Sequence, residues 1–255
     1  MDKNRRGFLG SVGRVTIGAT ASVAGLSASE DAQAARQPVK GAEGKHWGMV
    51  VDLRKCIGCQ ACTVACVMEN DVPEDAFRTH VSVYEVVKDR RDPAMVMLPR
   101  LCNHCDNPPC VPVCPVEATF KVEGSGEVLV DADRCVGCAY CVQACPYDAR
   151  FINHETQTAD KCTFCFHRTQ AGLLPACVET CVGGARNFGD LDDPESEVSQ
   201  MLAKHEVSVL RPEMHTNPNV YYIGLDDVLN GRVAGEAAYR PPLTTEAQGH
   251  AGEDA

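Results

Sequence analysis

The apolar residues of the chain come in short runs separated by polar residues, glycines and prolines. Beyond the N-terminal segment the first run is Trp47–Leu53, and its length and valine content are typical of a buried strand. The residues after Cys59 contain no glycine or proline as far as Val72, which predicts a short helix ending near Asn70. A strand followed by a helix is therefore expected at the start of the fold.

Two hairpins are predicted further along the chain. Residues 77–87 alternate apolar with polar side chains, and Met95–Leu98 is a second apolar run, so these two stretches should pair. Val122–Val130 carries Gly124-Ser125-Gly126 between apolar stretches, which indicates a second hairpin.

The C-terminal part predicts one helix and one strand. Asp193 and Pro194 are the residue types of a helix N-cap and a first helical position, and residues 198–202 carry one apolar stripe. Val220–Leu225 predicts a last strand, and residues 230–255, rich in Gly, Ala, Glu and Pro, predict a loose tail. Short hairpins and a few short helices together predict an α+β fold.

The cysteines add a repeated pattern, because all 16 fall into four groups without remainder. The groups are Cys56, Cys59, Cys62 and Cys66; Cys102, Cys105, Cys110 and Cys114; Cys135, Cys138, Cys141 and Cys145; and Cys162, Cys165, Cys177 and Cys181. The third group has the spacing x2, x2, x3 and is followed by Pro146, which is the bacterial ferredoxin run. In such a run three thiolates hold one cluster and the fourth binds another, so each group needs a partner group. Four 4Fe-4S clusters are the direct prediction.

Similar endings indicate which groups pair. Groups two and three both end in Cys-Pro, at Cys114 and Cys145, and only a hairpin separates them. Groups one and four both end in Cys-Val, at Cys66 and Cys181, and they flank the inner pair. We therefore predict two nested ferredoxin-like modules, each binding two 4Fe-4S clusters. Their boundaries would be residues 100–149 for the inner module and residues 35–99 with 150–229 for the outer module.

Disulfides, zinc and haem c are the other uses of paired cysteines. Disulfide frameworks are typical of short exported chains with irregular spacings, whereas this chain has 255 residues and repeated spacings. Zinc also binds Cys-x2-Cys pairs, but it needs neither a third cysteine two residues on nor a Cys-Pro ending. Haem c needs a histidine directly after the pair, and the sequence has none there. A Rieske cluster would need two histidines in place of cysteines, so His104 is expected to be a hydrogen-bonding or exposed residue.

The charge of the chain limits its partners. The formal net charge is −11 with neutral thiols, and four clusters with four thiolates each would add about −2 apiece, giving roughly −19. Nucleic acid and anionic lipid are therefore poor partners.

The N-terminus predicts export. Arg5 and Arg6 precede a weakly apolar segment, residues 12–28, and the small-residue site Ala32-Gln33-Ala34, which is the order of a Tat signal peptide. Residues 1–34 would then be removed, and a periplasmic location is expected. The remaining chain has no run near the ~18 apolar residues that a membrane span needs, so it would meet the membrane only through a partner.

Three stretches carry a family resemblance. They are RLCNHCDNPPCVPVCPVEATF at 100–120, RFINHETQTADKCTFC at 150–165 and LLPACVETCVGGAR at 173–186. With the x4 spacing in group two and the long insert in group four, they resemble the four-cluster subunits of the molybdopterin (dimethyl sulfoxide reductase) oxidoreductases, and specifically the iron-sulfur subunits of tetrathionate reductases. The resemblance covers most of residues 46–228.

What the resemblance implies is an electron relay without catalytic residues of its own. A polytopic membrane subunit would oxidise quinol, and a molybdopterin-containing catalytic subunit would reduce tetrathionate to thiosulfate. The implied ligand sets are Cys56, Cys59, Cys62 and Cys181; Cys162, Cys165, Cys177 and Cys66; Cys102, Cys105, Cys110 and Cys145; and Cys135, Cys138, Cys141 and Cys114.

Several charged residues near these groups have two interpretations each. Lys55, Arg100, Arg134 and Lys161 lie within two residues of a first ligand and would favour a reduced cluster, or they are solvated charges. His167 and the following Arg168 would contact a partner or belong to a solvated loop.

The cysteine pattern is also compatible with other functions. The chain could serve an equivalent periplasmic reductase for polysulfide, nitrite or sulfite-linked respiration. It could also be a free periplasmic polyferredoxin, which would share every ligand. A colourless binding module stapled by zinc or disulfides is the third alternative, whereas a cluster protein is brown.

Replacing Arg5 and Arg6 by lysine should leave cluster-loaded precursor in the cytoplasm, because the paired arginines are what a twin-arginine exporter reads. Cell fractionation with immunoblotting measures this. Continued delivery of the R5K/R6K chain to the periplasm would show that this segment is not the signal or that a partner carries the chain.

Overall fold

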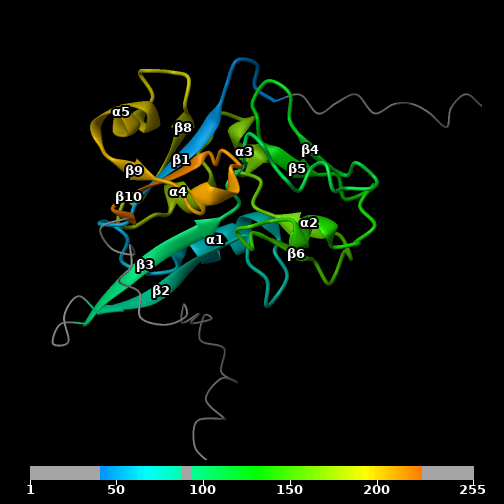
Figure 1. The fold of residues 1–255 in the computed structure, drawn as a ribbon, viewed down its shortest axis with the longest axis horizontal. Coiled ribbons are helices and arrows are strands. Elements are labelled where there is room, and N and C mark those ends of the chain that lie inside the picture. Colours follow the sequence, from blue (N-terminus) through cyan, green and yellow to red (C-terminus); the bar gives the residue numbers. More distant parts are fainter. Residues whose placement is uncertain (1–40, 88–92, 226–255) are drawn as a thin grey trace, which may run out of the picture. The chain divides into compact units, whose positions relative to one another are not determined.

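The computed structural model describes residues 41–87 and 93–225, in which the helices and strands are short (Figure 1). The expected export signal at residues 1–34 and the expected tail at residues 230–255 lie outside the described residues. Within the described ranges, no helix has the length and apolar content to cross a membrane.

A four-stranded sheet, in the order β8-β1-β10-β9, contains the first and the last predicted strands. Its members are β1 (Trp47–Asp52), β8 (Arg186–Asp190), β9 (Val207–Ser208) and β10 (Val220–Ile223). β1 is antiparallel to β8 and parallel to β10, and β10 is antiparallel to β9. The strands expected at Trp47–Leu53 and Val220–Leu225 are therefore confirmed, whereas the sequence pattern did not predict β8 and β9.

The two faces of β1 pack against different partners, as the alternation of a strand requires. Val50 packs against Val198 of α5 (Glu197–Lys204) on one face. Met49 and Val51 join the main core on the other face, and that core includes four buried cysteines. The central sheet thus supports the cysteine-rich side of the molecule.

α5 begins three residues later than predicted. Ser196 is its N-cap, and the Ser196 Oγ accepts a hydrogen bond from the Ser199 amide at 3.2 Å. The Asp193 carboxylate instead accepts a hydrogen bond from the Glu195 amide at 2.9 Å. The N-cap prediction at Asp193 and Pro194 is therefore wrong, because Asp193 forms a local turn ahead of the helix.

The first predicted hairpin and helix are both present. β2 (Thr79–Val87) and β3 (Pro93–Leu101) are antiparallel, with Thr79 opposite Leu101. α1 (Ala61–Asn70) ends where the sequence predicts and packs against β2 and α4 (Ala176–Glu179).

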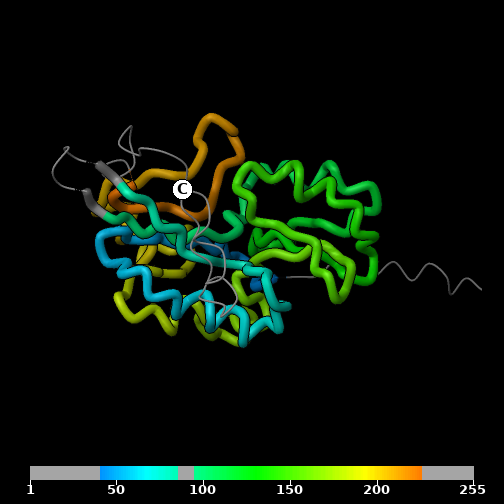
Figure 2. The backbone as a smooth tube through the Cα atoms, turned by 90° about the horizontal axis from the view of Figure 1, so that it is seen from below, coloured from blue at the N-terminus to red at the C-terminus, as the bar shows by residue number. Residues whose placement is uncertain are grey.

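Two further small hairpins belong to the middle of the chain. The elements here are β4 (Thr119–Lys121) with β5 (Val128–Val130), β6 (Arg150–Ile152) with β7 (Ala159–Lys161), α2 (Tyr140–Gln143) and α3 (Phe166–Thr169). The 3-10 helix η2 (Pro212–Met214) lies later in the chain, between β9 and β10. Figure 2 shows β4, α2 and β6, drawn in green, grouped beside the blue and orange strands of the central sheet. The hairpin expected at Val122–Val130 is confirmed, and β6 and β7 were not predicted.

Backbone hydrogen bonds attach the loop of cysteine group two to the segment that leads into β10. The Asp106 amide donates to the Asn217 carbonyl at 2.8 Å, and the Asn219 amide donates to the Asn103 carbonyl at 2.9 Å. Cys102 and Cys105 are therefore held close to the central sheet although they precede β10 by more than 100 residues.

Candidate cluster-binding sites

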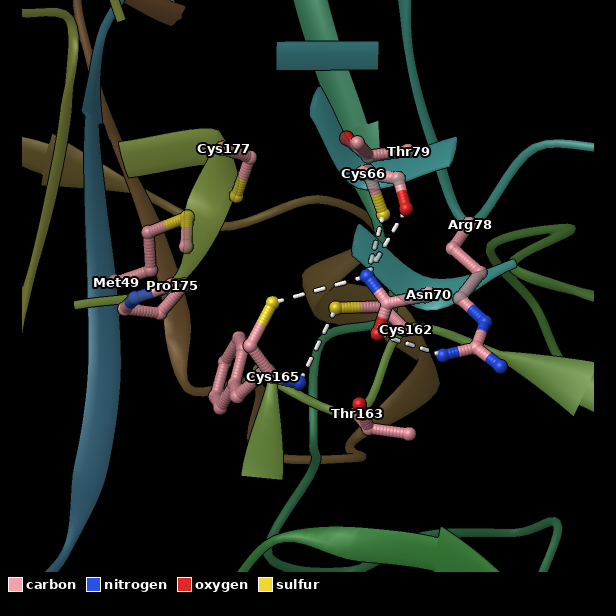
Figure 3. Close-up of a pocket in the computed structure, with 11 residues that line it drawn as sticks. Met49, Cys66, Asn70, Arg78, Thr79, Cys162, Thr163, Cys165, Pro175 and Cys177 are labelled. Carbon is pink, nitrogen blue, oxygen red and sulfur yellow. Dashed lines mark hydrogen bonds between the residues drawn. The ribbon is translucent and has the colours of Figure 1, made fainter. Parts of the chain in front are cut away.

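Four cysteines line one cavity beside the central sheet (Figure 3). Cys162 and Cys165 lie in the loop that leaves β7, Cys177 lies on α4, and Cys66 lies in the middle of α1. The structure thus brings together three cysteines of group four and the last cysteine of group one. These are the members of one implied ligand set.

Burial dominates the acid-base behaviour of these thiols. It raises the pKa of Cys66 to about 12 and that of Cys177 to about 11, and neighbouring cysteine charges add to both shifts only in second place or later. A buried thiolate is unfavourable unless positive charge compensates it. The donor set therefore fits an iron-sulfur cluster, whose irons supply that charge and displace the thiol protons on binding.

Hydrogen-bond donors also point at this set of sulfurs. The Phe164 amide donates to Cys162 Sγ at 3.4 Å. The Asn70 side-chain amide lies 3.6 Å from Cys66 Sγ and 3.8 Å from Cys165 Sγ, and Arg78 donates to the Asn70 oxygen at 2.9 Å (Figure 3). Donors to ligand sulfurs favour a more negative cluster, so Asn70 is placed to raise its reduction potential.

A second cavity is lined by Cys56, Cys59, Cys62 and Cys181. The first two come from the loop after β1, Cys62 from the first turn of α1, and Cys181 from the loop after α4. The Ala185 amide donates to Cys181 Sγ at 3.2 Å. This loop and that of Cys56 approach closely at Gly183, where a Cβ would lie 2.3 Å from the Lys55 carbonyl oxygen.

The cysteines of group two come together with Cys145 from group three. The pKa of Cys105 is raised to about 11. Burial is the largest cause, a hydrogen bond from Thr216 opposes it, and the charges of Cys102, Cys110 and Cys145 add to it. All four members of this implied set therefore interact electrostatically.

Contacts among the remaining four cysteines are less direct. Cys135 and Cys141 pack in one small apolar cluster. Cys114 lies just before β4, where its Sγ accepts a hydrogen bond from the Ala118 amide at 3.2 Å. The Asp131 amide donates a hydrogen bond to the Ala118 carbonyl. The Cys135 amide donates to the Asp131 carbonyl at 3.1 Å. The pairing of β4 with β5 thus brings the loop of Cys114 beside the loop of Cys135.

Disulfide bonds and single metal ions are the other uses of cysteine sulfurs that the sequence raised. All sixteen cysteines are free of disulfide bonds. In the part of the chain that the structure describes, no three His, Cys, Asp or Glu side chains converge on a point that could hold a single metal ion. The exposed members are Cys59 and Cys138, and the others are buried or half-buried.

Of the predicted cations, only Lys161 lies in the interior, with 1% of its surface exposed. Its Nζ donates to the carbonyl oxygens of Val128 and Cys162. Lys55 and Arg134 are exposed, and Arg100 donates to the Tyr147 carbonyl at 2.8 Å.

Three other residues singled out from the sequence have partners within the chain. His104 is buried, accepts a hydrogen bond from the Val128 amide at 3.1 Å and stacks on Phe164 at 3.8 Å between ring centroids, which confirms the hydrogen-bonding interpretation. His167 and Arg168 both pair with Glu69 of α1, so they hold the group-four insert against that helix.

Sequence reasoning missed the two arginines that lie deepest among the cysteines, Arg150 and Arg186. A signal for them was present, because each is the fifth residue after the last cysteine of its group, Cys145 or Cys181.

Family models match the part of the chain that carries these cavities. A 4Fe-4S dicluster domain matches residues 55–118, and a second 4Fe-4S dicluster domain matches residues 93–191. The chain is therefore a double dicluster protein, and its sixteen cysteines fit four 4Fe-4S clusters.

Whole-chain relatives narrow the class. The tetrathionate reductase B subunit of Salmonella typhimurium is 56% identical over 251 residues, which are 96% of this chain and 97% of that protein. Protein NrfC of Escherichia coli K12 is 46% identical over 181 residues, covering 71% of this chain and 81% of NrfC. The tetrathionate reductase B subunit of Archaeoglobus fulgidus is 44% identical over 197 residues, covering 74% of this chain and 91% of that protein. The chain belongs to the family of tetrathionate reductase B subunits and related reductase iron-sulfur subunits, and it is an electron-transfer subunit.

Asn70→Leu should lower the reduction potential of one of the four clusters, because it removes the side-chain donor to Cys66 and Cys165. Asn70→Asp should lower the same potential further, because it adds negative charge at the same place. A potentiometric titration followed by EPR measures both. Equal potentials in the wild type and the two variants would mean that the amide does not act on the cluster.

Proposed function

We propose that this chain is the electron relay of a periplasmic tetrathionate reductase. It would receive electrons from a polytopic quinol-oxidising membrane subunit and pass them to a molybdopterin-containing catalytic subunit. The observation that supports this most strongly is 56% identity to the Salmonella typhimurium tetrathionate reductase B subunit, over 97% of the length of that protein. Two electrons would be delivered for each tetrathionate that is split into two thiosulfates. Tat-dependent export, with residues 1–34 removed, is part of the proposal and rests on Arg5 and Arg6.

We further propose that the clusters are bound in the nested arrangement, with the fourth ligands exchanged between groups. Support comes from the cavity lined by Cys66 with three cysteines of group four, and from the cavity lined by Cys181 with three cysteines of group one. The electrostatic interaction of Cys145 with the cysteines of group two supports the same exchange in the inner module.

The proposed order of the relay follows from neighbouring sites. Cys102 and Cys162 pack in the same cluster of buried residues. Burial raises the pKa of Cys162, and the charge of Cys102 adds to that shift. Both observations support a group-four site that is adjacent to the group-two site. The sites of Cys56 and Cys135 would then lie at the two ends. Each of these end sites contains an exposed cysteine, Cys59 or Cys138. Exposure at the ends supports entry and exit of electrons there, since transfer to a partner needs a short distance.

The chain's own residues would hold each cluster and exclude water from it. A 4Fe-4S cluster supplies a one-electron couple when it is bound. The thiolates anchor it, while backbone amides such as those of Phe164 and Ala185 donate to ligand sulfurs. Burial of the two central sites limits side reactions of the reduced clusters with solvent.

Deleting this chain from the organism should abolish tetrathionate reduction driven by quinol, because the catalytic subunit would lose its electron supply. Reduction driven by a small artificial donor should persist, since such donors reach the catalytic subunit directly. Whole-cell and membrane assays of thiosulfate production measure the two rates. Unchanged quinol-driven reduction would contradict the relay.

Cys145→Ser tests the exchange of fourth ligands. In the nested arrangement it should damage the cluster on Cys102, Cys105 and Cys110, which would lose one iron or be lost. Anaerobic thiol alkylation read by mass spectrometry should then find label on those three cysteines, while the group-three cysteines Cys135, Cys138 and Cys141 stay protected.

The reciprocal variant is the matched control. Cys114→Ser should expose Cys135, Cys138 and Cys141 and leave the group-two cysteines protected. If each variant instead exposes the cysteines of its own group, the four clusters are independent and the nested arrangement is wrong.

A further inference from the structure

Two buried arginines occupy equivalent positions in the two proposed modules. Arg150 opens β6 and Arg186 opens β8, and each follows an alanine. Each is also the fifth residue after the last cysteine of its group, which is Cys145 or Cys181. The repeat places the same side chain at the same point of both modules.

Arg186 lies between the two cavities of the outer module. Only 2% of its surface is exposed, and it lines the cavity of the group-one cysteines. Its Nη2 donates at 2.8 Å to Thr79 Oγ1, and Thr79 lines the other cavity. Burial by itself would lower the pKa of Arg186, but Cys177 and Cys62, which belong to different cavities, raise it. The Nη1 nitrogen is buried without a hydrogen-bond partner among the described residues.

Arg150 repeats this arrangement in the inner module. It is 5% exposed, its Nη1 donates to Thr119 Oγ1 at 3.2 Å, and its Nη2 donates to Cys110 Sγ at 3.1 Å. Cys110 packs in the same cluster of buried residues as Cys141. Burial by itself would lower the pKa of Arg150, while Cys110 and, less strongly, Cys141 raise it. These two cysteines belong to the two different ligand sets of the inner module.

The threonine partners are equivalent as well. Thr79 opens β2, the first strand after Cys66, and Thr119 opens β4, the first strand after Cys114. In each module, therefore, an arginine behind one exchanged cysteine donates to a threonine behind the other. The guanidinium is held at the junction between two sites.

Neither arginine has a carboxylate within ion-pair distance among residues 41–87 and 93–225. A buried cation without a counter-ion is unfavourable, and arginine does not escape by losing its proton. Cysteine sulfurs do most to favour the charge of the guanidinium ions, chiefly Cys110 for Arg150 and Cys177 for Arg186, and they become thiolates when they bind iron.

We propose that Arg150 and Arg186 are each a single counter-ion shared by the two clusters of one module, and that each raises both reduction potentials of its pair. The proposal rests on the ligand sets of the proposed function. Reduction adds one electron and no proton to a cluster, so its charge becomes more negative by one while the arginine stays protonated. A fixed cation beside both clusters stabilises that added charge in either one. Arg150 and Arg186 act on the clusters through their positive charge and do not carry electrons themselves.

The experiment uses the full chain, loaded anaerobically, with Arg186→Gln and Arg150→Gln as neutral variants and Arg186→Lys and Arg150→Lys as charge-conserving controls. The wild type first has to contain four titratable clusters, which tests the proposed function separately. In R186Q two of the four potentials measured by EPR titration should fall, and in R150Q the other two should fall. The lysine variants should retain most of the wild-type potentials. Asn70→Leu, which touches sulfurs of one set only, should shift a single potential.

Several results would overturn the sharing. A fall of one potential, or of all four equally, in R186Q would show that the arginine does not serve one pair. Equal falls in the lysine and glutamine variants would show that its charge is not responsible.

Loss of iron from a glutamine variant gives a second readout. Thiol alkylation should then rise in R186Q at all eight cysteines of the outer module while the eight of the inner module stay protected. Label confined to one ligand set, or spread over all sixteen cysteines, would contradict a counter-ion shared within one module.

Discussion

The spacing of three residues between the third and fourth cysteine of a group is the constraint on which the structure depends. In α1 it puts Cys62 and Cys66 one helical turn apart on the same buried face. The two thiols nevertheless line different cavities. One rigid helix thereby fixes the separation of two sites. α4 carries Cys177, and Cys181 follows two residues after its end, so this helix also joins the two sites. The small strands and loops then have only to close around sites whose positions these helices have set.

Burial of so many thiols imposes an electrostatic requirement on everything around them. Burial is the largest cause of the raised pKa of Cys66 and Cys177, so these side chains carry charge only when positive charge compensates it. The interior therefore contains charged groups that would be costly in an ordinary core, such as Lys161 and Arg186. These buried cations compensate the negative charge of the cysteine thiolates and of the clusters that the thiolates would bind.

Sequence reasoning predicted the parts of the fold that depend on local patterns. β1, α1 and the hairpin turn at Gly124 follow from apolar runs, the absence of helix breakers and turn residues. β6, β7 and β9 have only two or three residues each, which is too short for any periodic signal. The error at Asp193 has a different cause: two residues with capping chemistry, Asp193 and Ser196, lie close together, and packing of Val198 on the sheet decides between them.

The candidate sites also have a part that the sequence predicted and a part that it did not. The spacing of the sixteen cysteines identifies them as cluster ligands, because a 4Fe-4S cluster needs thiolates at these separations along the chain. The charges that act on them were assigned to residues adjacent in sequence, and of these only Lys161 is buried. Arg150 and Arg186 reach the sulfurs through strands that begin five residues beyond a ligand, and only the fold brings them back. Their repeated position is evident in the sequence, but their proximity to the cysteines is evident only from the structure.

The main core joins cysteines of the proposed cluster sites to ordinary apolar residues. Met49, Val51 and Tyr222 pack in the same cluster of buried residues as Cys62 and Cys162. With aromatic residues at only 5% of the chain, side chains alone leave those regions lined by thiols and short of apolar volume. Without iron, the buried cations would also face neutral thiols in place of thiolates. Under the proposed function, cluster binding would complete this core before export, in a compartment where thiols stay reduced. The proposed Tat route, which moves folded proteins, is the export route that this coupling favours.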